Sequence, residues 1–449
     1  MKRSDYSYVF GDIADGLSSV RVTDHTKDVS WEARATIRDN QILSEIGQCT
    51  SPIVADIADL ALAVAFADRF SSRREDTEYR IEIALPMRKP EVFSGILDSL
   101  ESILYWFTDD HWSFQFTHRD TDGRFAERQP YLWSPGESKQ PVEVALWSGG
   151  LDALSGLYNR LLADPCSQHI LVGSGSNNYI HSTQRSLAGM VEDSFPDRTK
   201  LVQIPLRWNG TKSIRKESSS RTRGFVFLLL GAACATLAHQ NTLSIYENGM
   251  GAINLPFRES EVGLDHSRSV HPISLRDMSN FVSRLLGAPF QFHNPFLFST
   301  KAQMCAVLRR SEAMPLVHRS VSCDRRLRAR PTQCGQCSSC LLRRLALAIQ
   351  GIEENVKETY ICTESRDGAH FQAMLSQIET LRSCRLDADD SWYRLTERYP
   401  SLLEVTDCIA AQEGKGVSEV IESLTHLYHC YVQEWDSVWN LPSNVRRVA

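Results

Sequence analysis

The chain has 449 residues, of which 42% are apolar and 23% are charged, an ordinary composition for a globular protein. This composition excludes a disordered chain, a collagen-like repeat and a coiled coil. The 49 basic and 55 acidic residues give a net charge of −6, so the chain as a whole does not attract nucleic acid or an anionic membrane. The length predicts two or three domains.

The cysteine content and the first residues predict a cytoplasmic protein with reduced thiols. Twelve cysteines are too few for a disulfide scaffold, and MKRSDYSYVFGDIADGL lacks the apolar core of an export signal. The longest apolar run, residues 225–238, is too short to cross a bilayer. We therefore expect no membrane contact. The sequence gives no oligomeric state.

Residues 1–140 predict a small α/β accessory domain. Apolar residues recur at helical spacing in 55–70 and 91–107, whereas 80–86 and 112–117 alternate between apolar and polar residues. The first pair is typical of amphipathic helices and the second pair of half-buried strands.

From residue 141 to residue 362 the pattern changes to short, almost continuously apolar runs separated by helical stretches. The expected strands are 142–147, 169–174, 200–206 and 243–248, and the expected helices are 151–163, 181–194 and 222–240. This alternation predicts a doubly wound parallel sheet, a Rossmann-like α/β fold. Residues 363–449 are polar and helical in pattern, and they predict a helical C-terminal extension.

The segment Ser148–Asp152, with the sequence SGGLD, follows the expected strand 142–147 and opens a helix. Adjacent glycines let the backbone turn sharply and point N–H groups at one place at a helix N-terminus, where an anion is stabilised. Asp152 fits a first-turn cap and could help to hold Mg²⁺ beside phosphates. The pattern is neither a Walker A motif nor GxGxxG. A plain strand-to-helix turn capped by Asp152 stays open as the alternative.

A second motif contains four cysteines with the spacing C-x10-C-x2-C-x2-C: Cys323, Cys334, Cys337 and Cys340. Two-residue spacings let neighbouring thiolates converge on one tetrahedral centre. Four sulfurs without a nearby histidine favour a closed structural Zn²⁺ site in the module 320–345. An iron–sulfur cluster, a redox pair and unligated core cysteines are the alternatives.

The loop alone resembles the pyrophosphate loop of PP-loop ATPases, which split ATP into AMP and pyrophosphate. Both motifs, in this order, resemble the 7-cyano-7-deazaguanine synthase (QueC) family of that class. Two further segments resemble the same family, SSSRTRGFVFLLLGAACA at 218–235 and NPFLFSTKAQMC at 294–305. The resemblance covers about residues 142–362. It implies an adenine nucleotide α hydrolase-like fold and an ATP-dependent, AMP-forming ligase that uses Mg²⁺ and Zn²⁺.

The resemblance also implies roles for single residues. The expected nucleotide-binding residues are Leu146, Trp147, Ser148, Gly149, Gly150, Leu151, Asp152, Val172 and Gly173. The expected catalytic residues are Asp152, Arg223 and Lys301, and Arg221 is an expected substrate-binding residue. Glu247 and Asn254 lie in a stretch that replaces a segment of the family, and they are further candidates for substrate binding, at a purine-like edge. The implied substrate is a deazapurine, 7-carboxy-7-deazaguanine, whose carboxylate is adenylated and then attacked by an amine.

The chain departs from the family pattern in three places. Ala153 stands where the family's loop usually has Ser, so one hydroxyl is lost while the backbone donor remains. The Tyr-Gly-Gln after the second strand is not visible, and Gln184 is a shifted counterpart. The YPDCR segment after the fourth strand is missing. Nucleotide binding is therefore a safer expectation than a full catalytic rate.

The N-terminal region resembles the extension of QueC-like proteins in bacterial antiphage systems, such as QatC and the QueC-like component of some CBASS systems. That branch implies conjugation of a deazaguanine to a partner protein, with residues 1–140 as the docking region and antiviral defence as the context. Three alternatives remain: a synthase that uses ammonia in queuosine biosynthesis, a tRNA-modifying ATPase and a non-catalytic nucleotide sensor. Basic runs at 207–223 and 309–330 suggest the tRNA enzyme, but no RNA-reading module is evident, and nucleic acid is not the expected partner.

Overall fold

The computed structural model describes most of the chain. The described residues are 4–12, 16–47, 50–73, 78–119, 127, 141–175, 177–209, 220–257, 268–324, 331–363 and 368–439. Their strands, in chain order, are β1 (Tyr6–Phe10), β2 (Leu17–Asp24), β3 (Val29–Ile37), β4 (Arg80–Met87), β5 (His111–His118), β6 (Val142–Leu146), β7 (Gln168–Gly175), β8 (Thr199–Asn209), β9 (Thr242–Ser244) and β10 (Gln291–His293).

The helices before β10 are α1 (Pro52–Phe70), α2 (Pro90–Ser94), α3 (Leu97–Thr108), α5 (Leu151–Ala163), α6 (Asn178–Ser194), α7 (Arg223–Leu237), α8 (Gly249–Ile253) and α9 (Pro272–Leu286). Those after β10 are α10 (Lys301–Cys305), α11 (Met314–Arg319), α12 (Ser338–Ile349), α13 (Val356–Thr359), α14 (Ala369–Ser383), α15 (Ser391–Arg398), α16 (Ser401–Glu413) and α17 (Val417–Trp439). Short helical turns cover Ile42–Ile46, Ala306–Arg309 and Ser311–Ala313.

The described strands form one ten-stranded sheet in the order β10-β9-β6-β7-β8-β3-β2-β1-β4-β5. Neighbours from β10 to β8 are parallel, and so are β1, β4 and β5, whereas β8, β3, β2 and β1 pair antiparallel. The expectation of an α/β fold with a mostly parallel sheet is therefore confirmed. The sequence reading missed β1, β2 and β3, which add an antiparallel segment to it.

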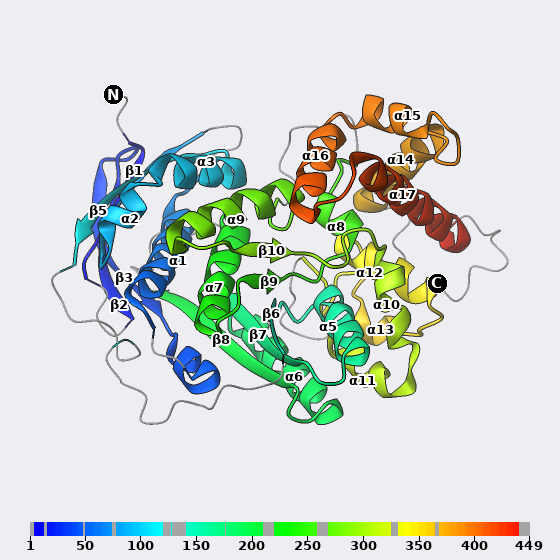
Figure 1. Ribbon diagram of the computed structural model, residues 1–449, viewed down its shortest axis with the longest axis horizontal. Helices are drawn as coiled ribbons and strands as arrows, with labels where there is room; N and C mark the ends of the chain where they lie inside the picture. The colour runs from blue at the N-terminus through cyan, green and yellow to red at the C-terminus, as the bar shows by residue number, and fades with distance from the viewer. Residues whose placement is uncertain are drawn as a thin grey trace.

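The sheet is continuous across the expected boundary at residue 140, because β3 pairs with β8. The register places Arg34 opposite Asn209 and Ile37 opposite Leu206. Figure 1 shows the N-terminal strands at the left and the parallel strands of the core at the centre. The division into domains at residues 140 and 362 stays a prediction.

Helices cover both faces of the parallel strands β6 to β8. Helix α7 packs on one face, where Leu146 and Val172 belong to the same apolar core as its leucines. Helices α5 and α6 pack on the other face, in a core that contains Trp147 and Leu171. This arrangement is the doubly wound pattern, and it leaves the carboxyl ends of the strands open for a site.

Helices α1 and α7 pack against each other and join the two halves of the sheet (Figure 1). Both are apolar on nearly all sides and almost wholly buried, as helices inside a large core are. The core that contains them runs from Tyr6 to Phe292 and includes strands from both halves.

The C-terminal helices α14 to α17 form a separate apolar core with parts of α8 and α12. They lie at the upper right of Figure 1, in orange and red. The expected helical C-terminal extension is therefore present. Among the described helices, none has the length and apolar character needed to cross a bilayer.

Candidate functional site

The SGGLD loop lies at the carboxyl end of β6, where it connects this strand to α5. Gly149 has φ +75°, a backbone conformation that L side chains rarely adopt, and this explains a glycine there. The Ser148 hydroxyl accepts a hydrogen bond from the Gly150 amide at 3.2 Å. The expected strand, turn and helix are thus present at the expected residues.

The first turn of α5 presents backbone donors. The Leu151 amide donates to the Ser322 hydroxyl at 3.4 Å, and the Leu154 amide donates to the Gly150 carbonyl. The amides of Asp152 and Ala153 have no hydrogen-bond acceptor in the part of the chain that the structure describes. With the helix dipole, they form the kind of N-terminus that binds an anion.

Lys301, the first residue of α10, pairs with the Asp152 carboxylate, although the two residues lie far apart in the sequence. The Asn248 side chain donates to Asp152 at 3.0 Å and to Glu247 at 2.7 Å. Lys301 is only 6% exposed. Burial opposes its charged form, but the carboxylates of Asp152 and Glu247 outweigh burial and raise the pKa of Lys301.

Glu247 follows β9 and faces Asp152 and Lys301. Burial, and then the negative charge of Asp152, raise the pKa of Glu247 to about 8, while Lys301 partly opposes them. A carboxyl with this pKa exchanges its proton near neutral pH. The cluster can therefore hold one positive charge between two carboxyl groups, and it can accept or release a proton.

Arg223 opens α7 and is a second cation at the site. Protein packs around its side chain. The side chain is nevertheless exposed to solvent, because it lines a pocket. Its guanidinium makes no hydrogen bond or ion pair with any residue that the structure describes, and the carboxylate of Asp324 is the charge nearby. A cation that forms no ion pair with the described residues is suited to an anionic ligand.

A pocket of about 580 Å³ unites these groups. Of the residues expected at a site, it is lined by Leu146, Ser148, Gly150, Asp152, Arg223, Glu247, Asn254, Lys301 and Cys323. The loop, the two cations and the carboxyl cluster thus share one cavity at the carboxyl ends of the parallel strands.

The other expected nucleotide-binding residues lie beneath the pocket or beside it. Leu151 and Val172 are fully buried in the core, and the Trp147 indole donates to the Gln184 carbonyl at 3.0 Å. The Gln184 side chain covers Gly173 and donates to the Trp147 carbonyl at 2.8 Å. Gly149 supports the loop through its carbonyl, which accepts from the Val321 amide. Of the expected residues Leu146, Trp147, Val172 and Gly173, only Leu146 is among those that line the pocket.

Arg221 is not among the residues that line the pocket. Its Nη1 donates to the Thr108 carbonyl at the end of α3, at 2.6 Å. Beside it, the buried carboxylate of Asp68 in α1 accepts from the Ser220 hydroxyl at 2.7 Å and from the Thr222 hydroxyl at 3.0 Å. The N-terminal half of the molecule thus holds the residues that precede Arg223.

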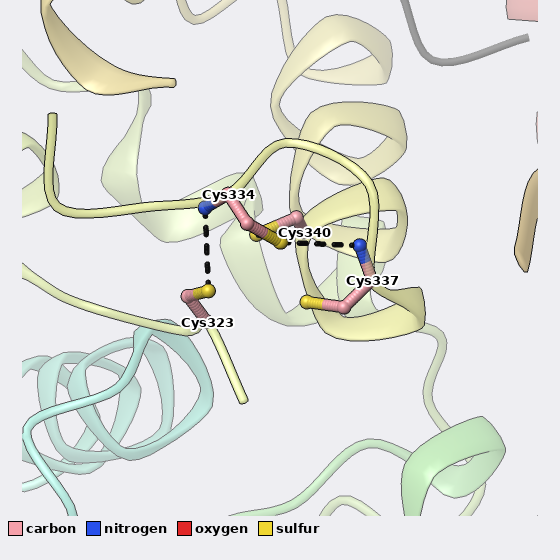
Figure 2. Close-up of side chains that lie close together, drawn as sticks. All are labelled: Cys323, Cys334, Cys337 and Cys340. Carbon is pink, nitrogen blue, oxygen red and sulfur yellow. Dashed lines mark hydrogen bonds between the residues drawn. The ribbon is translucent and has the colours of Figure 1, made fainter. Parts of the chain in front are cut away.

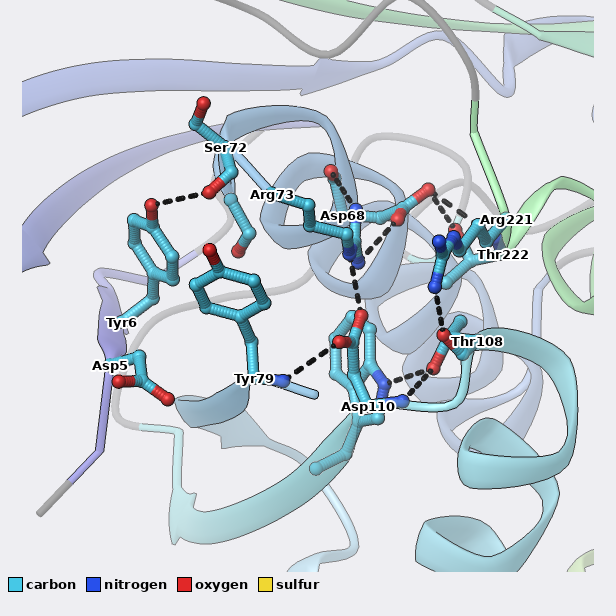
Figure 3. A network of polar contacts seen from close by, with 12 residues as sticks. Asp5, Tyr6, Asp68, Ser72, Arg73, Tyr79, Thr108, Asp110, Arg221 and Thr222 are labelled. Atoms are coloured by element: carbon cyan, nitrogen blue, oxygen red, sulfur yellow. Dashed lines mark hydrogen bonds and ion pairs between the residues drawn. The ribbon is translucent and has the colours of Figure 1, made fainter. Parts of the chain in front are cut away.

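Figure 3 shows the rest of this network. Arg73 lies between two buried carboxylates, 2.9 Å from Asp68 and 2.6 Å from Asp110. Asp110 also accepts from the Tyr79 amide at 3.0 Å. The sequence offered no signal for this network, because its members come from α1, from the segments around β4 and β5, and from the start of α7.

The four cysteines of the second motif come together as expected (Figure 2). Their sulfur atoms all lie within 4.8 Å of one another, and all four residues are buried. The amides of Cys334 and Cys337 donate to the sulfurs of Cys323 and Cys334, each at 3.3 Å. Four convergent soft ligands supported by N–H donors fit Zn²⁺, which would stabilise this fold locally.

The cysteine cluster is connected directly to the loop. Val321 and Ser322 precede Cys323, and they contact Gly149 and Leu151 through the two hydrogen bonds described above. The buried Arg343 holds the same segment from the other side, with Nη1 2.8 Å from the Ser320 hydroxyl and Nη2 2.7 Å from Glu354. Sequence reasoning missed Val321 and Ser322; their position just before Cys323 was the only clue.

Comparison with known proteins gives no family for this chain: no protein-family model matches it, and no curated protein matches it at a significant level. Its described part is a mixed α/β protein with a ten-stranded, mostly parallel sheet and a buried four-cysteine cluster that could hold zinc.

Proposed function

We propose that this protein is a QueC-like ATPase of the PP-loop, adenine nucleotide α hydrolase-like class. It adenylates the carboxylate of 7-carboxy-7-deazaguanine, or of a similar deazapurine, and transfers the acyl group to an amine. The observation that carries the proposal is the shared pocket, where the amides of the SGGLD loop, Arg223 and the Asp152–Lys301 pair meet.

In this proposal the loop and the start of α5 bind the phosphates of ATP. A carboxylate oxygen of the substrate attacks the α-phosphorus, and the bond from that phosphorus to pyrophosphate breaks. Negative charge grows on the pyrophosphate and on the phosphoryl oxygens in this step. Arg223, Lys301 and the amides of Asp152 and Ala153 are positioned donors for that charge. Mg²⁺, when bound with ATP beside Asp152, would neutralise part of it.

The second step forms the C–N bond. The amine attacks the acyl carbon, AMP leaves with the electrons of the C–O bond, and the nitrogen loses a proton. Glu247 is our candidate for the group that accepts this proton, since its pKa of about 8 matches the operating range of a general base. The acceptor that the resemblance implies is the N-terminal amine of a partner protein, in antiphage defence.

The test is a reaction of the full chain with ATP, Mg²⁺ and 7-carboxy-7-deazaguanine, to which ammonia or a candidate partner protein is added. AMP, pyrophosphate and product masses are measured. We expect AMP and pyrophosphate in equal amounts and a mass increase on the partner. Tight ATP binding without AMP formation with any acceptor would overturn the proposal, and a 7-cyano product with ammonia would overturn protein conjugation.

A pair of variants tests whether Arg223 takes part in the reaction. Arg223→Gln should lower AMP formation at least about 100-fold, the scale for loss of one positioned donor to a transition-state charge. Arg284→Gln, which removes an exposed arginine of α9, is the control and should leave the rate unchanged. Equal rates of AMP formation for both variants would show that Arg223 does not take part in the reaction.

A further inference from the structure

The C-terminal helices form one wall of the pocket. Gln377 of α14 and Tyr431 of α17 line the same cavity as the SGGLD loop. In Figure 1 these two helices lie beside α8 and α12, whose residues Met250 and Leu342 also face the cavity. The sequence predicted a helical extension, but it did not predict that Gln377 and Tyr431 belong to the site.

Gln377 is 2% exposed, and its hydrogen bonds fix the orientation of its amide. Its nitrogen donates to the carbonyls of Leu255 and Pro256, at 2.9 and 3.2 Å. Two carbonyl partners require the NH₂ group there, which leaves Oε1 on the other side of the amide. Oε1 has no donor among the described residues and is not enclosed by protein, so it is an acceptor open to the pocket.

Tyr431 is also 2% exposed, and its hydroxyl has no partner in the described part of the chain. The hydroxyl is not enclosed by protein either, whereas the hydroxyl of Tyr428, one turn earlier on α17, is completely enclosed. Tyr431 lines the pocket and Tyr428 does not. Since burial raises the pKa of Tyr431, its hydroxyl stays protonated and can donate at every physiological pH.

The pocket has both ionisable and apolar lining. Arg223, Lys301 and the α5 amides lie among the carboxyl groups of Asp152, Glu247 and Asp324. Met250, Leu255 and Leu342 add apolar lining, and the Gln377 oxygen and the Tyr431 hydroxyl are two open polar groups of the same pocket. Such a surface suits a flat, uncharged ring that carries one hydrogen-bond donor and one acceptor at its edge. A site with buried polar groups rejects analogues that leave those groups unpaired.

We propose that Tyr431 and Gln377 select the heterocycle whose carboxylate is activated, with a ring N–H bound to the Gln377 oxygen and a ring oxygen or nitrogen bound to the Tyr431 hydroxyl. The C-terminal helices then determine substrate specificity, while the parallel strands carry the ATP chemistry. This inference rests on the proposed function and adds specificity residues to the same site.

The test compares Tyr431→Phe with Tyr428→Phe, which removes the enclosed hydroxyl of the same helix and serves as the matched control. Rates of AMP formation are measured with 7-carboxy-7-deazaguanine and ATP varied separately. Tyr431→Phe should raise the KM of the acid about tenfold and leave the KM of ATP unchanged, because one hydrogen bond to the ring is lost. Tyr428→Phe should change neither constant.

A second measurement tests Gln377. An acid analogue in which methylation removes the ring N–H should react at least about tenfold less efficiently with the wild type. In Gln377→Met the two acids should react alike, since the acceptor is absent for both.

The outcomes separate the two proposals. A wild type that forms AMP, with the same acid KM in Tyr431→Phe and Tyr428→Phe, would overturn the assignment of Tyr431 and leave the proposed function standing. A wild type that forms no AMP with any acid would overturn the proposed function and this inference with it.

Discussion

The two halves of the sheet are built from different kinds of strand. In β1 to β5 buried and open residues alternate, so one face packs on α1 and α3, and the other, with Val9 50% and Leu17 42% exposed, is open. In β6 to β8 the strands are apolar in longer runs and both faces are covered by helices. We call β1 to β5 the alternating half, which has one core face, and β6 to β8 the covered half, which has two.

This difference separates the candidate site from the residues that support it. The pocket lies at the carboxyl ends of the covered half, where every cation and carboxyl group of the candidate site is found. The alternating half contributes Asp68 and Thr108, which hold the start of α7 from outside the pocket. A region that the sequence suggests as a docking surface is therefore also a support for Arg223.

The largest expected effect tests whether the chemistry lies in the covered half. Asp152→Asn should lower AMP formation about 1000-fold, because Lys301 loses its charged partner and the site loses a carboxylate beside the phosphates. Asp193→Asn, at an exposed position of α6, is the control and should react as the wild type does. Normal turnover of Asp152→Asn would place the site elsewhere.

The second effect concerns the four-cysteine cluster, which is connected to the loop. Loss of zinc by chelation, or Cys337→Ser, should lower the melting temperature by about 5–10 °C, because a structural zinc contributes several kcal/mol to folding. The KM of ATP should rise as well, since the segment before Cys323 supports Gly149 and Leu151. Cys166→Ser, at an exposed thiol, is the control. Metal analysis should find zinc, and a coloured, iron-containing protein would favour the iron–sulfur alternative.

The sequence predicted the features that depend on neighbouring residues better than those that depend on residues far apart in the chain. Strand β6, the SGGLD turn and α5 are consecutive, so local pattern and backbone geometry were enough to predict them. The expected strand 243–248 is shorter, ending at Ser244, because the backbone turns toward Glu247 and α8 there. The alternating strands β2 and β3 escaped prediction because their buried positions include Ser18, Asp24, Ala33 and Ala35, which are polar or small and weaken the apolar alternation.

The site shows the same limit. The four cysteines could be predicted because their spacing encodes their geometry. Asp68, Gln377 and Tyr431 could not, because their roles depend on α1, α14 and α17 packing around the pocket. Arg221 and Arg223 look equivalent in the sequence, and only the fold directs one to Thr108 and the other to the pocket.

The third effect tests the support from the alternating half. Asp68→Asn should destabilise the protein by about 3 kcal/mol, because it leaves the buried Arg73 with one carboxylate partner instead of two. It should also raise the KM of ATP severalfold, since the start of α7 is held less firmly. Glu32→Gln breaks an exposed pair with Arg21 on the open face and should cost less than about 0.5 kcal/mol. The free energy of unfolding is measured by chemical denaturation. Similar losses of stability in both variants would show that Asp68 supports the fold no more than an exposed ion pair does.

The fourth effect concerns pH and the carboxyl cluster of the covered half. An unfolded glutamate titrates near 4.5, whereas the pKa of Glu247 in the fold is about 8, because burial and Asp152 disfavour its charge. Between these two pH values the folded chain keeps a proton that the unfolded chain has released. Its contribution to stability is therefore complete below pH 4.5 and is lost as the pH rises through 8.

Glu247→Gln removes this proton exchange, so the variant should lose less stability than the wild type between pH 5 and pH 9. The measurement is the free energy of unfolding from urea titrations at several pH values. Asp152 and Lys301 stay in both proteins, so the difference between their two pH slopes isolates Glu247. Glu32→Gln, in the open face of the alternating half, should keep the wild-type slope because that side chain is exposed. Parallel slopes for the wild type and Glu247→Gln would show that Glu247 is ionised in the fold at neutral pH, which would contradict the raised pKa of this residue.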